Sequence, residues 1–252
     1  MKSLGLVLCL FPSLLFAQNI AKVVPAANEK QLGNGGADAP FTLNPGGSAR
    51  FQEVFSSSEF SSFGAPDLLL IGIEFRTDEQ AGHGDVHKVI PDFQIDFSTT
   101  ARAPDGLSSV FAENVGANNR AVVPRGPLSV NTGGFHGPDS FDFYVPLDSP
   151  FYYSPAQGNL LMDIRNYSGV QTTFFDMQGT TGDSISRVHS ESLNSSAGVN
   201  AASGQTDTYG LVVKFIMQPV PEPGTAALLA LGLGLIGVGY WTRKPRPRKE
   251  DQ

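Results

Sequence analysis

Hydrophobic and polar residues alternate along several short segments of this chain. In residues 71–76, isoleucine and phenylalanine share one face, while Glu74 and Arg76 fall on the other. Successive side chains of a β-strand point to opposite faces, so this period predicts half-buried strands. The same reasoning predicts further strands, each bounded by Gly, Pro, Asn, Asp or Ser, at residues 50–55, 93–97, 141–147, 160–165, 172–177 and 209–216.

No amphipathic helical stretch of similar length competes with these strands. The pattern therefore predicts an all-β body over residues 50–218, built as an antiparallel, jelly-roll-like β-sandwich with the 18 phenylalanines supplying its core. Residues 18–49 are rich in Gly, Asn, Pro and Ala, and we expect a flexible lead-in with an edge strand near residues 41–43. We expect an exposed loop at residues 190–206. Residues 99–132 are expected to be irregular, because the prolines between Val122 and Pro127 interrupt a strand.

The N-terminus has the features of a secretory signal peptide. Lys2 precedes an apolar stretch over residues 4–16, and Ala17 is a small residue at the cleavage position. We therefore expect residues 1–17 to be removed on export. The one cysteine, Cys9, would leave with this signal, so the mature chain has no disulfide and depends on its hydrophobic core.

The C-terminus combines a rigid motif, an apolar run and a basic tail. Pro221, Glu222 and Pro223 form an extended segment, since proline fixes φ and lacks a backbone donor. Residues 225–242 would span about 27 Å as a helix, which is enough for one transmembrane helix. The tail, residues 243–252, predicts a cytoplasmic C-terminus, because it carries Arg243, Lys244, Arg246, Arg248 and Lys249.

This order of a signal, a β-rich body, Pro221-Glu222-Pro223, a short helix and a basic cluster resembles the PEP-CTERM class of exported bacterial proteins. The resemblance implies recognition by an exosortase, a membrane-embedded, cysteine transpeptidase-like enzyme of Gram-negative bacteria that make exopolysaccharide or biofilm matrix. It also implies removal of the tail near the motif, followed by release or attachment at the cell surface. The resemblance covers residues 219–252, and the body resembles no family of known activity.

Charge is divided unevenly between the body and the tail. The chain has 24 acidic and 17 basic residues, and the basic cluster follows the apolar run, so the exported body is acidic. Such a body is not expected to bind nucleic acid or an anionic membrane surface. Its charge can serve solubility or bind divalent cations.

Residues 77–87 contain the best candidate for a metal site. His83, Asp85 and His87, with the nearby carboxylates of Asp78 and Glu79, offer ligands that suit a divalent cation. The alternative is a solvated hairpin loop, because a glycine-containing connection does not place both histidines on one face. No other cofactor is expected.

We expect a protein without catalytic residues. Asp92 and Asp96 lie on the polar face of one predicted strand, and paired carboxylates can serve a glycosidase, but such residues also form ordinary solvated sheet faces. No nucleophile elbow or phosphate-binding glycine loop occurs, and Gly133–Gly137 is expected to be a turn.

The sequence therefore favours a non-enzymatic protein of the cell surface or extracellular matrix. One alternative is a carbohydrate-binding module for exopolysaccharide, with Tyr152 and Tyr153 as glycan contacts. These tyrosines can equally pack at a strand edge, and the single tryptophan, Trp241, lies outside the body. A further alternative is an exported hydrolase.

Overall fold

The computed structural model describes residues 18–63 and 67–220. Within these ranges the chain is all-β, with short 3-10 turns and no α-helix. The strands are β1 (Ile20–Val24), β2 (Gly35–Ala37), β3 (Ser48–Phe55), β4 (Asp67–Phe75), β5 (Val86–Thr100), β6 (Arg120–Thr132), β7 (Phe143–Tyr153), β8 (Asn159–Asn166), β9 (Phe175–Gly179), β10 (Ile185–Ser192), β11 (Gln205–Asp207), β12 (Tyr209–Leu211) and β13 (Val213–Val220).

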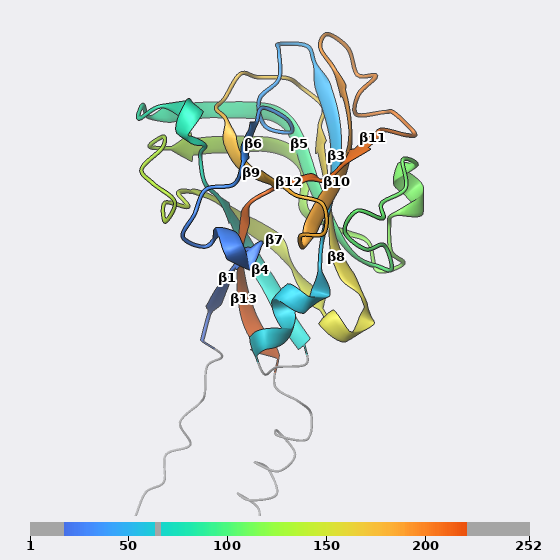
Figure 1. Cartoon of the computed structure of the whole chain (residues 1–252). Coiled ribbons are helices and arrows are strands. Elements are labelled where there is room, and N and C mark those ends of the chain that lie inside the picture. The colour runs from blue at the N-terminus through green and yellow to red at the C-terminus, as the bar shows by residue number, and fades with distance from the viewer. Residues whose placement is uncertain (1–17, 64–66, 221–252) are drawn as a thin grey trace, which may run out of the picture.

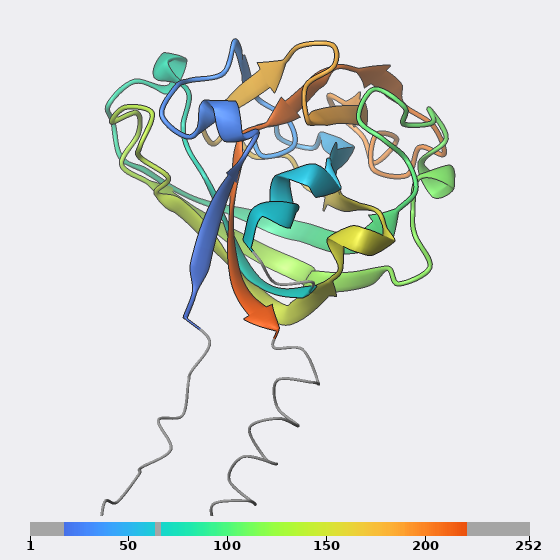
Figure 2. The ribbon, with the colours of Figure 1, turned by 60° about the horizontal axis from the view of Figure 1, so that its bottom comes forward.

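The strands form three antiparallel sheets (Figure 1). The four-stranded sheet has the order β1-β13-β4-β7, and the six-stranded sheet has the order β11-β10-β3-β8-β5-β6. The three-stranded sheet, β12-β9-β2, continues the four-stranded sheet, because the Val212 amide donates to the Asp176 carbonyl at 3.0 Å and Thr77 bridges to Phe175. Figure 2 shows the long strands of the six-stranded sheet passing beneath the other strands in two layers.

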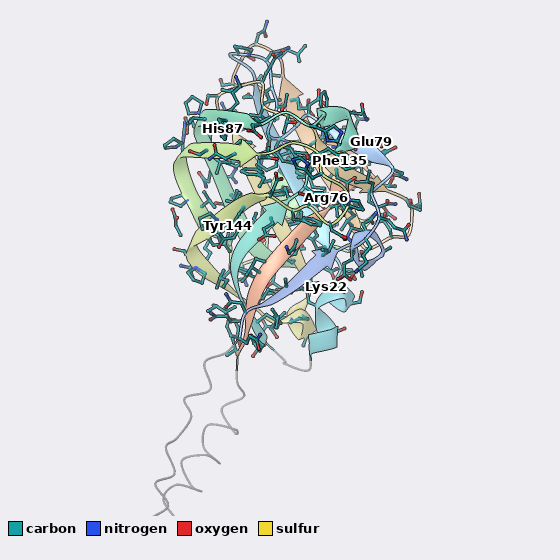
Figure 3. All side chains as sticks on the ribbon, turned by 90° about the vertical axis from the view of Figure 1, so that its left-hand side faces the viewer. Lys22, Arg76, Glu79, His87, Phe135 and Tyr144 are labelled. Carbon is teal, nitrogen blue, oxygen red and sulfur yellow. The ribbon has the colours of Figure 1, made fainter. Side chains whose placement is uncertain are left out.

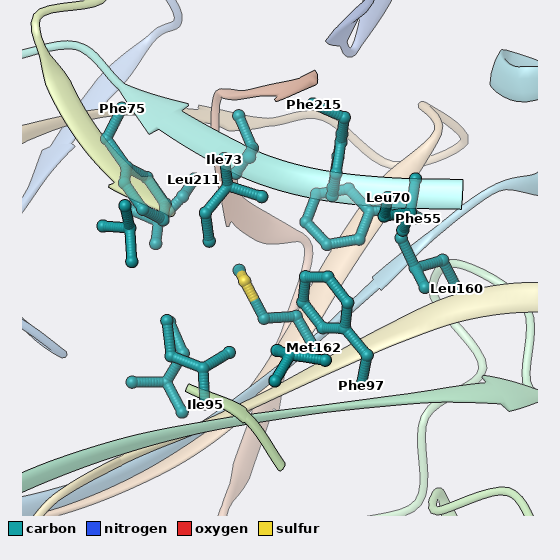
Figure 4. Close-up of a cluster of buried hydrophobic side chains, with 14 of the residues drawn as sticks. Phe55, Leu70, Ile73, Phe75, Ile95, Phe97, Leu160, Met162, Leu211 and Phe215 are labelled. Atoms are coloured by element: carbon teal, nitrogen blue, oxygen red, sulfur yellow. The ribbon is translucent and has the colours of Figure 1, made fainter. Parts of the chain in front are cut away.

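The hydrophobic core fills the space between these layers. Phe215 of β13 lies 5.0 Å from Phe55 of β3, measured between ring centroids, and Phe97 of β5 lies 5.7 Å from Phe151 of β7. All four rings are at most 1% exposed. Figure 4 shows apolar side chains reaching toward each other from the opposed strands. Because burying one such side chain contributes about 1.5–3 kcal/mol, the alternating phenylalanines supply much of the stability, as expected from the sequence.

The expected flexible lead-in is wrong, because most of it belongs to the folded body. β1 pairs with β13 from Ile20↔Met217 to Val24↔Val213, and β2 pairs with β9. Residues 41–43 do not form the expected edge strand. Instead, Phe41 is fully buried and packs between aromatic rings from both layers, namely Phe75, Phe93, Phe143 and Phe175.

The expected irregular region at residues 99–132 is confirmed for residues 101–119 and wrong for its last part. β6 occupies residues 120–132 and pairs with β5, despite Pro124 and Pro127. These prolines are accommodated because β6 is the edge strand of its sheet, and the pairing shifts register beside them. Similarly, β10 extends to Ser192 and β11 begins at Gln205, so the exposed loop is shorter than the expected 190–206.

The first and last strands meet at one pole of the body. β1 begins and β13 ends there, since Ile20 and Met217 are antiparallel partners (Figure 2). β4 also begins at this pole, where Asp67 is the partner of Val220. No helix in the described part of the chain is long and apolar enough to cross a membrane. The expected signal peptide, residues 1–17, and the expected transmembrane helix, residues 225–242, lie outside the described residues.

Candidate functional site

Strand β10 presents a row of charged side chains. Arg187, His189 and Glu191 are two residues apart, so the strand places all three on the same face. β10 is held on one side by β3 and on the other by the short strand β11, which supplies Asp207. The row is therefore fixed on a paired strand close to the edge of the six-stranded sheet.

Asp207 is the centre of a charged network on this row. Its two carboxylate oxygens accept hydrogen bonds from Nε of Arg187 at 2.9 Å and from Nη2 at 3.0 Å. Nε2 of His189 lies 3.4 Å from the same carboxylate, and Nδ1 of His189 lies 3.0 Å from Oε1 of Glu191. The Tyr209 amide also donates to Asp207 at 2.9 Å.

This arrangement favours the doubly protonated form of His189. The hydrogen bonds to Asp207 and Glu191 raise the pKa of His189, since each ring nitrogen faces a carboxylate acceptor. Burial opposes the ionisation of Asp207, but His189 and Arg187 outweigh it and lower the pKa of Asp207 to about 2. The His189 hydrogen bond also lowers the pKa of Glu191. The network thus places the favoured imidazolium of His189 and the guanidinium of Arg187 beside two ionised carboxylates.

Beneath this network lies a buried carboxyl group, Glu53. It is the direct partner of Arg187 across β3 and β10, and it is fully buried. Burial raises the pKa of Glu53 well above its usual range, although the Leu211 amide donates to Oε2 at 3.1 Å. Glu53 therefore packs beneath the site and is not accessible to a ligand.

A polar groove runs beside β10. Two hollows, of about 210 and 380 Å³, share Asp38 and Glu191 as lining residues. We name them together the β10 groove, which lies between residues 36–44, residues 171–177 and the row of Arg187, Glu191 and Leu193. A third hollow of about 210 Å³ lies against Arg187 and Asp207. The network and the groove thus share Arg187 and Glu191.

The larger hollow combines polar groups with apolar side chains. The hydroxyl groups of Thr42 and Thr172 lie 2.6 Å apart, and Gln171 donates to Oδ1 of Asn44 at 3.3 Å. Phe174 is 36% exposed beside these groups. The hollow can therefore offer donors, acceptors and part of an aromatic ring to one ligand.

The histidines predicted as metal ligands have separate partners. Nδ1 of His83 lies 2.5 Å from the Phe135 carbonyl, and Nδ1 of His87 lies 3.1 Å from Oδ1 of Asn131. No group of three or more His, Cys, Asp or Glu suited to a metal ion occurs within residues 18–63 and 67–220. Figure 3 labels His87 and Phe135 at different places on the body. The geometry gives no support to a metal site at His83, Asp85 and His87, and the site stays a prediction.

The two tyrosines proposed as glycan contacts face opposite ways. Tyr152 is 49% exposed, and its hydroxyl donates to Oδ2 of Asp67. Tyr153 is fully buried and donates to the Gly158 carbonyl at 2.9 Å, and burial raises its pKa. Adjacent residues of β7 alternate between faces, so only Tyr152 is available to a ligand.

The carboxylates considered for a glycosidase are both paired with arginine. Asp92 lies 2.6 Å from Nη2 of Arg125, whose hydrogen bond lowers the pKa of Asp92. Asp96 is almost fully buried and lies 3.2 Å from Nη1 of Arg165. Both therefore take part in the ion pairs of the six-stranded sheet.

Arg76 corrects a further expectation from the sequence. Alternation placed its side chain on a polar face, but the guanidinium is fully buried and binds Asp176 of β9, with 2.7 Å between Nε and Oδ2 (Figure 3). Its other nitrogens donate to the carbonyls of Asn28, Gln31 and Pro138. Arg76 thus joins three distant segments to the strand.

The β10 site was not predicted from the sequence. The available signal was the spacing of Arg187, His189 and Glu191, which places three charged residues on one face of any strand. This spacing gave no strand prediction because charged residues occupy one face of β10 and serines most of the other, so hydrophobic alternation is absent.

The comparisons with known proteins concern the end of the chain. Residues 219–244 match the model of the PEP-CTERM protein-sorting motif. No curated protein and no solved structure matches the chain. The match includes Pro221, Glu222 and Pro223 and confirms the resemblance found in the sequence. The chain therefore carries a PEP-CTERM sorting motif at residues 219–244, which implies an exported, cell-surface-associated protein that an exosortase processes.

Proposed function

We propose that the exported body is a non-enzymatic protein of the cell surface or extracellular matrix that binds polysaccharide in the β10 groove. The observation that carries the proposal is the larger hollow of the groove, which combines hydroxyl, amide and carboxylate groups with the exposed ring of Phe174. The sorting motif supports a location at the cell surface or outside the cell. It does not bear on the choice of ligand.

Sugars match this lining chemically. Each sugar hydroxyl can donate and accept hydrogen bonds, as can the threonine hydroxyls and the amides of Asn44 and Gln171. The apolar face of a sugar ring can pack on Phe174. The two hollows, of about 210 and 380 Å³, suit a ligand of small-molecule size or a short part of a longer chain.

The charges of the groove support binding without hydrolysis. A glycosidase needs one carboxylic acid with a raised pKa to protonate the leaving group. Glu191 has the opposite property, because the hydrogen bond from His189 lowers its pKa. Asp207 is likewise held ionised by His189 and Arg187. Neither Glu191 nor Asp207 therefore has the raised pKa that the acid of a glycosidase needs.

We also propose that the strands of the body have a jelly-roll-like arrangement. Its support is the path of the chain, which passes between sheets in the connections from β3 to β4, β4 to β5, β6 to β7 and β7 to β8. Residues 38–44 and 171–174 lie in two other connections, β2 to β3 and β8 to β9, which pass between the three-stranded and the six-stranded sheet. The groove forms at the border of these two sheets.

Polysaccharide binding can be tested with the mature chain purified from the producing cells and with the exopolysaccharide of the same cells. We expect measurable binding by the wild type, and a loss of at least about tenfold in affinity for Phe174→Ala and for Gln171→Ala. Calorimetry or pull-down would measure it. Release of reducing ends during the incubation would contradict the non-enzymatic part.

The control is Tyr152→Ala, which removes an even more exposed aromatic ring at another place on the body. We expect it to bind like the wild type. Loss of binding in Tyr152→Ala with unchanged binding in Phe174→Ala would move the site to β7. Absence of binding by the wild type would refute the proposal.

A further inference from the structure

The segment that matches the sorting motif begins inside the folded body. The match starts at residue 219, and Pro219 and Val220 are still paired in β13, with Leu68 and Asp67 of β4 as partners. The Pro-Glu-Pro motif follows at residue 221. No spacer in the sequence separates the sheet from the motif.

The end of β13 is held less firmly than its middle. From Val213 to Met217 the strand pairs with both β1 and β4, whereas the pairing with β1 goes no further than Met217 in the described residues. Among the described strands, Gln218, Pro219 and Val220 pair with β4 alone and are half-buried, and only the side chain of Gln218 reaches the start of β1, where it donates to Oδ1 of Asn19 at 3.0 Å. Pro219 also lacks a backbone donor. Such a strand end opens at low free-energy cost compared with the rest of the sheet.

The sequence also limits the distance between the body and the membrane. Val220 and the start of the apolar run at Ala226 are separated by six peptide units, which reach at most about 20 Å when extended. An enzyme that binds an extended substrate pairs with several consecutive residues of the substrate's backbone. At this motif, the residues on the N-terminal side are residues 218–220, the end of β13.

We propose that residues 218–220 detach from β4 when the sorting enzyme takes the motif, and that the pole around Asp67 and Tyr152 faces the enzyme and the membrane during this step. Tyr152 pairs with Leu69, which is two residues after Asp67, the first residue of β4. It is half-exposed there, as an interfacial tyrosine is. This inference rests on the sorting motif and is independent of polysaccharide binding.

A disulfide across the last strand pair tests the proposal. Asp67 and Val220 are direct partners, and the mature chain has no cysteine of its own, so the double variant Asp67→Cys, Val220→Cys can lock the end of β13 in an oxidising compartment. We expect the fraction of chains with a removed tail, measured by mass spectrometry, to fall at least about fivefold. Reductant should restore it.

The matched control locks the same two strands away from the motif. Glu74 and Lys214 are also direct partners, and Glu74→Cys, Lys214→Cys should be processed equally in its oxidised and reduced forms. In the locked variant, a flexible insertion of about six Gly and Ser residues after Val220 should restore processing, because it supplies the missing reach. Normal processing of the locked variant, or failure of the insertion to restore it, would overturn the proposal. So would a wild-type chain that keeps its tail.

Discussion

Two arginine–aspartate pairs in this protein have the same chemistry and different surroundings. Arg76 and Asp176 are both 0% exposed, and the guanidinium also donates to three backbone carbonyls. The side chains of Arg187 and Asp207 are 14% and 26% exposed, and Asp207 is shared with His189. The first pair lies between packed segments, and the second lies beside the β10 groove.

The difference indicates what each pair can do. At Arg76 every nitrogen has a partner, and Oδ1 of Asp176 accepts from the Gly33 amide at 2.9 Å, so a ligand could not bind without breaking the core. At Arg187 the network reaches solvent and includes a titrating histidine. Buried and satisfied charges specify the fold, whereas shared charges near water can respond to a ligand or to pH.

The largest effect is expected for Arg76→Met. Removing the guanidinium leaves the carboxylate of Asp176 buried without its cation and leaves carbonyls without donors, so the free energy of unfolding should fall by about 3–5 kcal/mol. Urea unfolding followed by tyrosine fluorescence would measure it. The control is Arg102→Met, because Arg102 and Glu113 form an exposed pair at 3.4 Å and should contribute less than about 1 kcal/mol. Equal losses in both variants would contradict the structural role of Arg76.

A smaller effect is expected for Asp207→Asn. The amide keeps an oxygen for the Tyr209 amide but loses the charge that attracts Arg187 and His189, so the free energy of unfolding should fall by about 1–2 kcal/mol. The loss stays moderate because water can reach the groups that are left. Asp176→Asn is the matched change at the buried pair and should cost more. If Asp207→Asn costs as much, the distinction between the two pairs fails.

The sequence predicts those parts of this protein whose pattern lies within one continuous segment. Alternation finds β4 and β5 because Ile73 and Phe75 of β4 face the same core as Ile95 and Phe97 of β5. The sorting motif is found because its parts follow one another in the chain. Alternation fails at Arg76, because it assigns a face without knowing what covers that face. The covering groups come from residues 28, 31, 138 and 176, which the fold alone brings together.

The β10 groove could not be predicted for the same reason. Its walls come from residues 36–44, 171–177 and 187–193, and no one segment carries a motif. The lead-in shows a related limit, since Phe41 lies in a stretch with the composition of a flexible linker. Its position is decided by the four aromatic rings around it, which composition does not reveal.

The smallest expected effect is a pH dependence at His189. Its pKa is raised by Asp207 and Glu191, so its contribution to stability is fully present below the unfolded value near 6.5 and is lost as pH rises through the folded value. The difference in free energy of unfolding between the wild type and His189→Gln should therefore shrink from pH 6 to pH 8.5. Asp207 and Glu191 have lowered pKa values and remain ionised throughout this window.

A double-mutant cycle isolates this contribution. In the Asp207→Asn background the imidazolium loses its first acceptor, so the change from His189 to Gln should depend less on pH than in the wild type. Urea unfolding at each pH would measure both differences. A difference that grows with pH would mean that His189 is neutral in the folded chain. In that case the pKa of His189 would be lowered in the folded chain, and the network beside the groove would gain stability as pH rises.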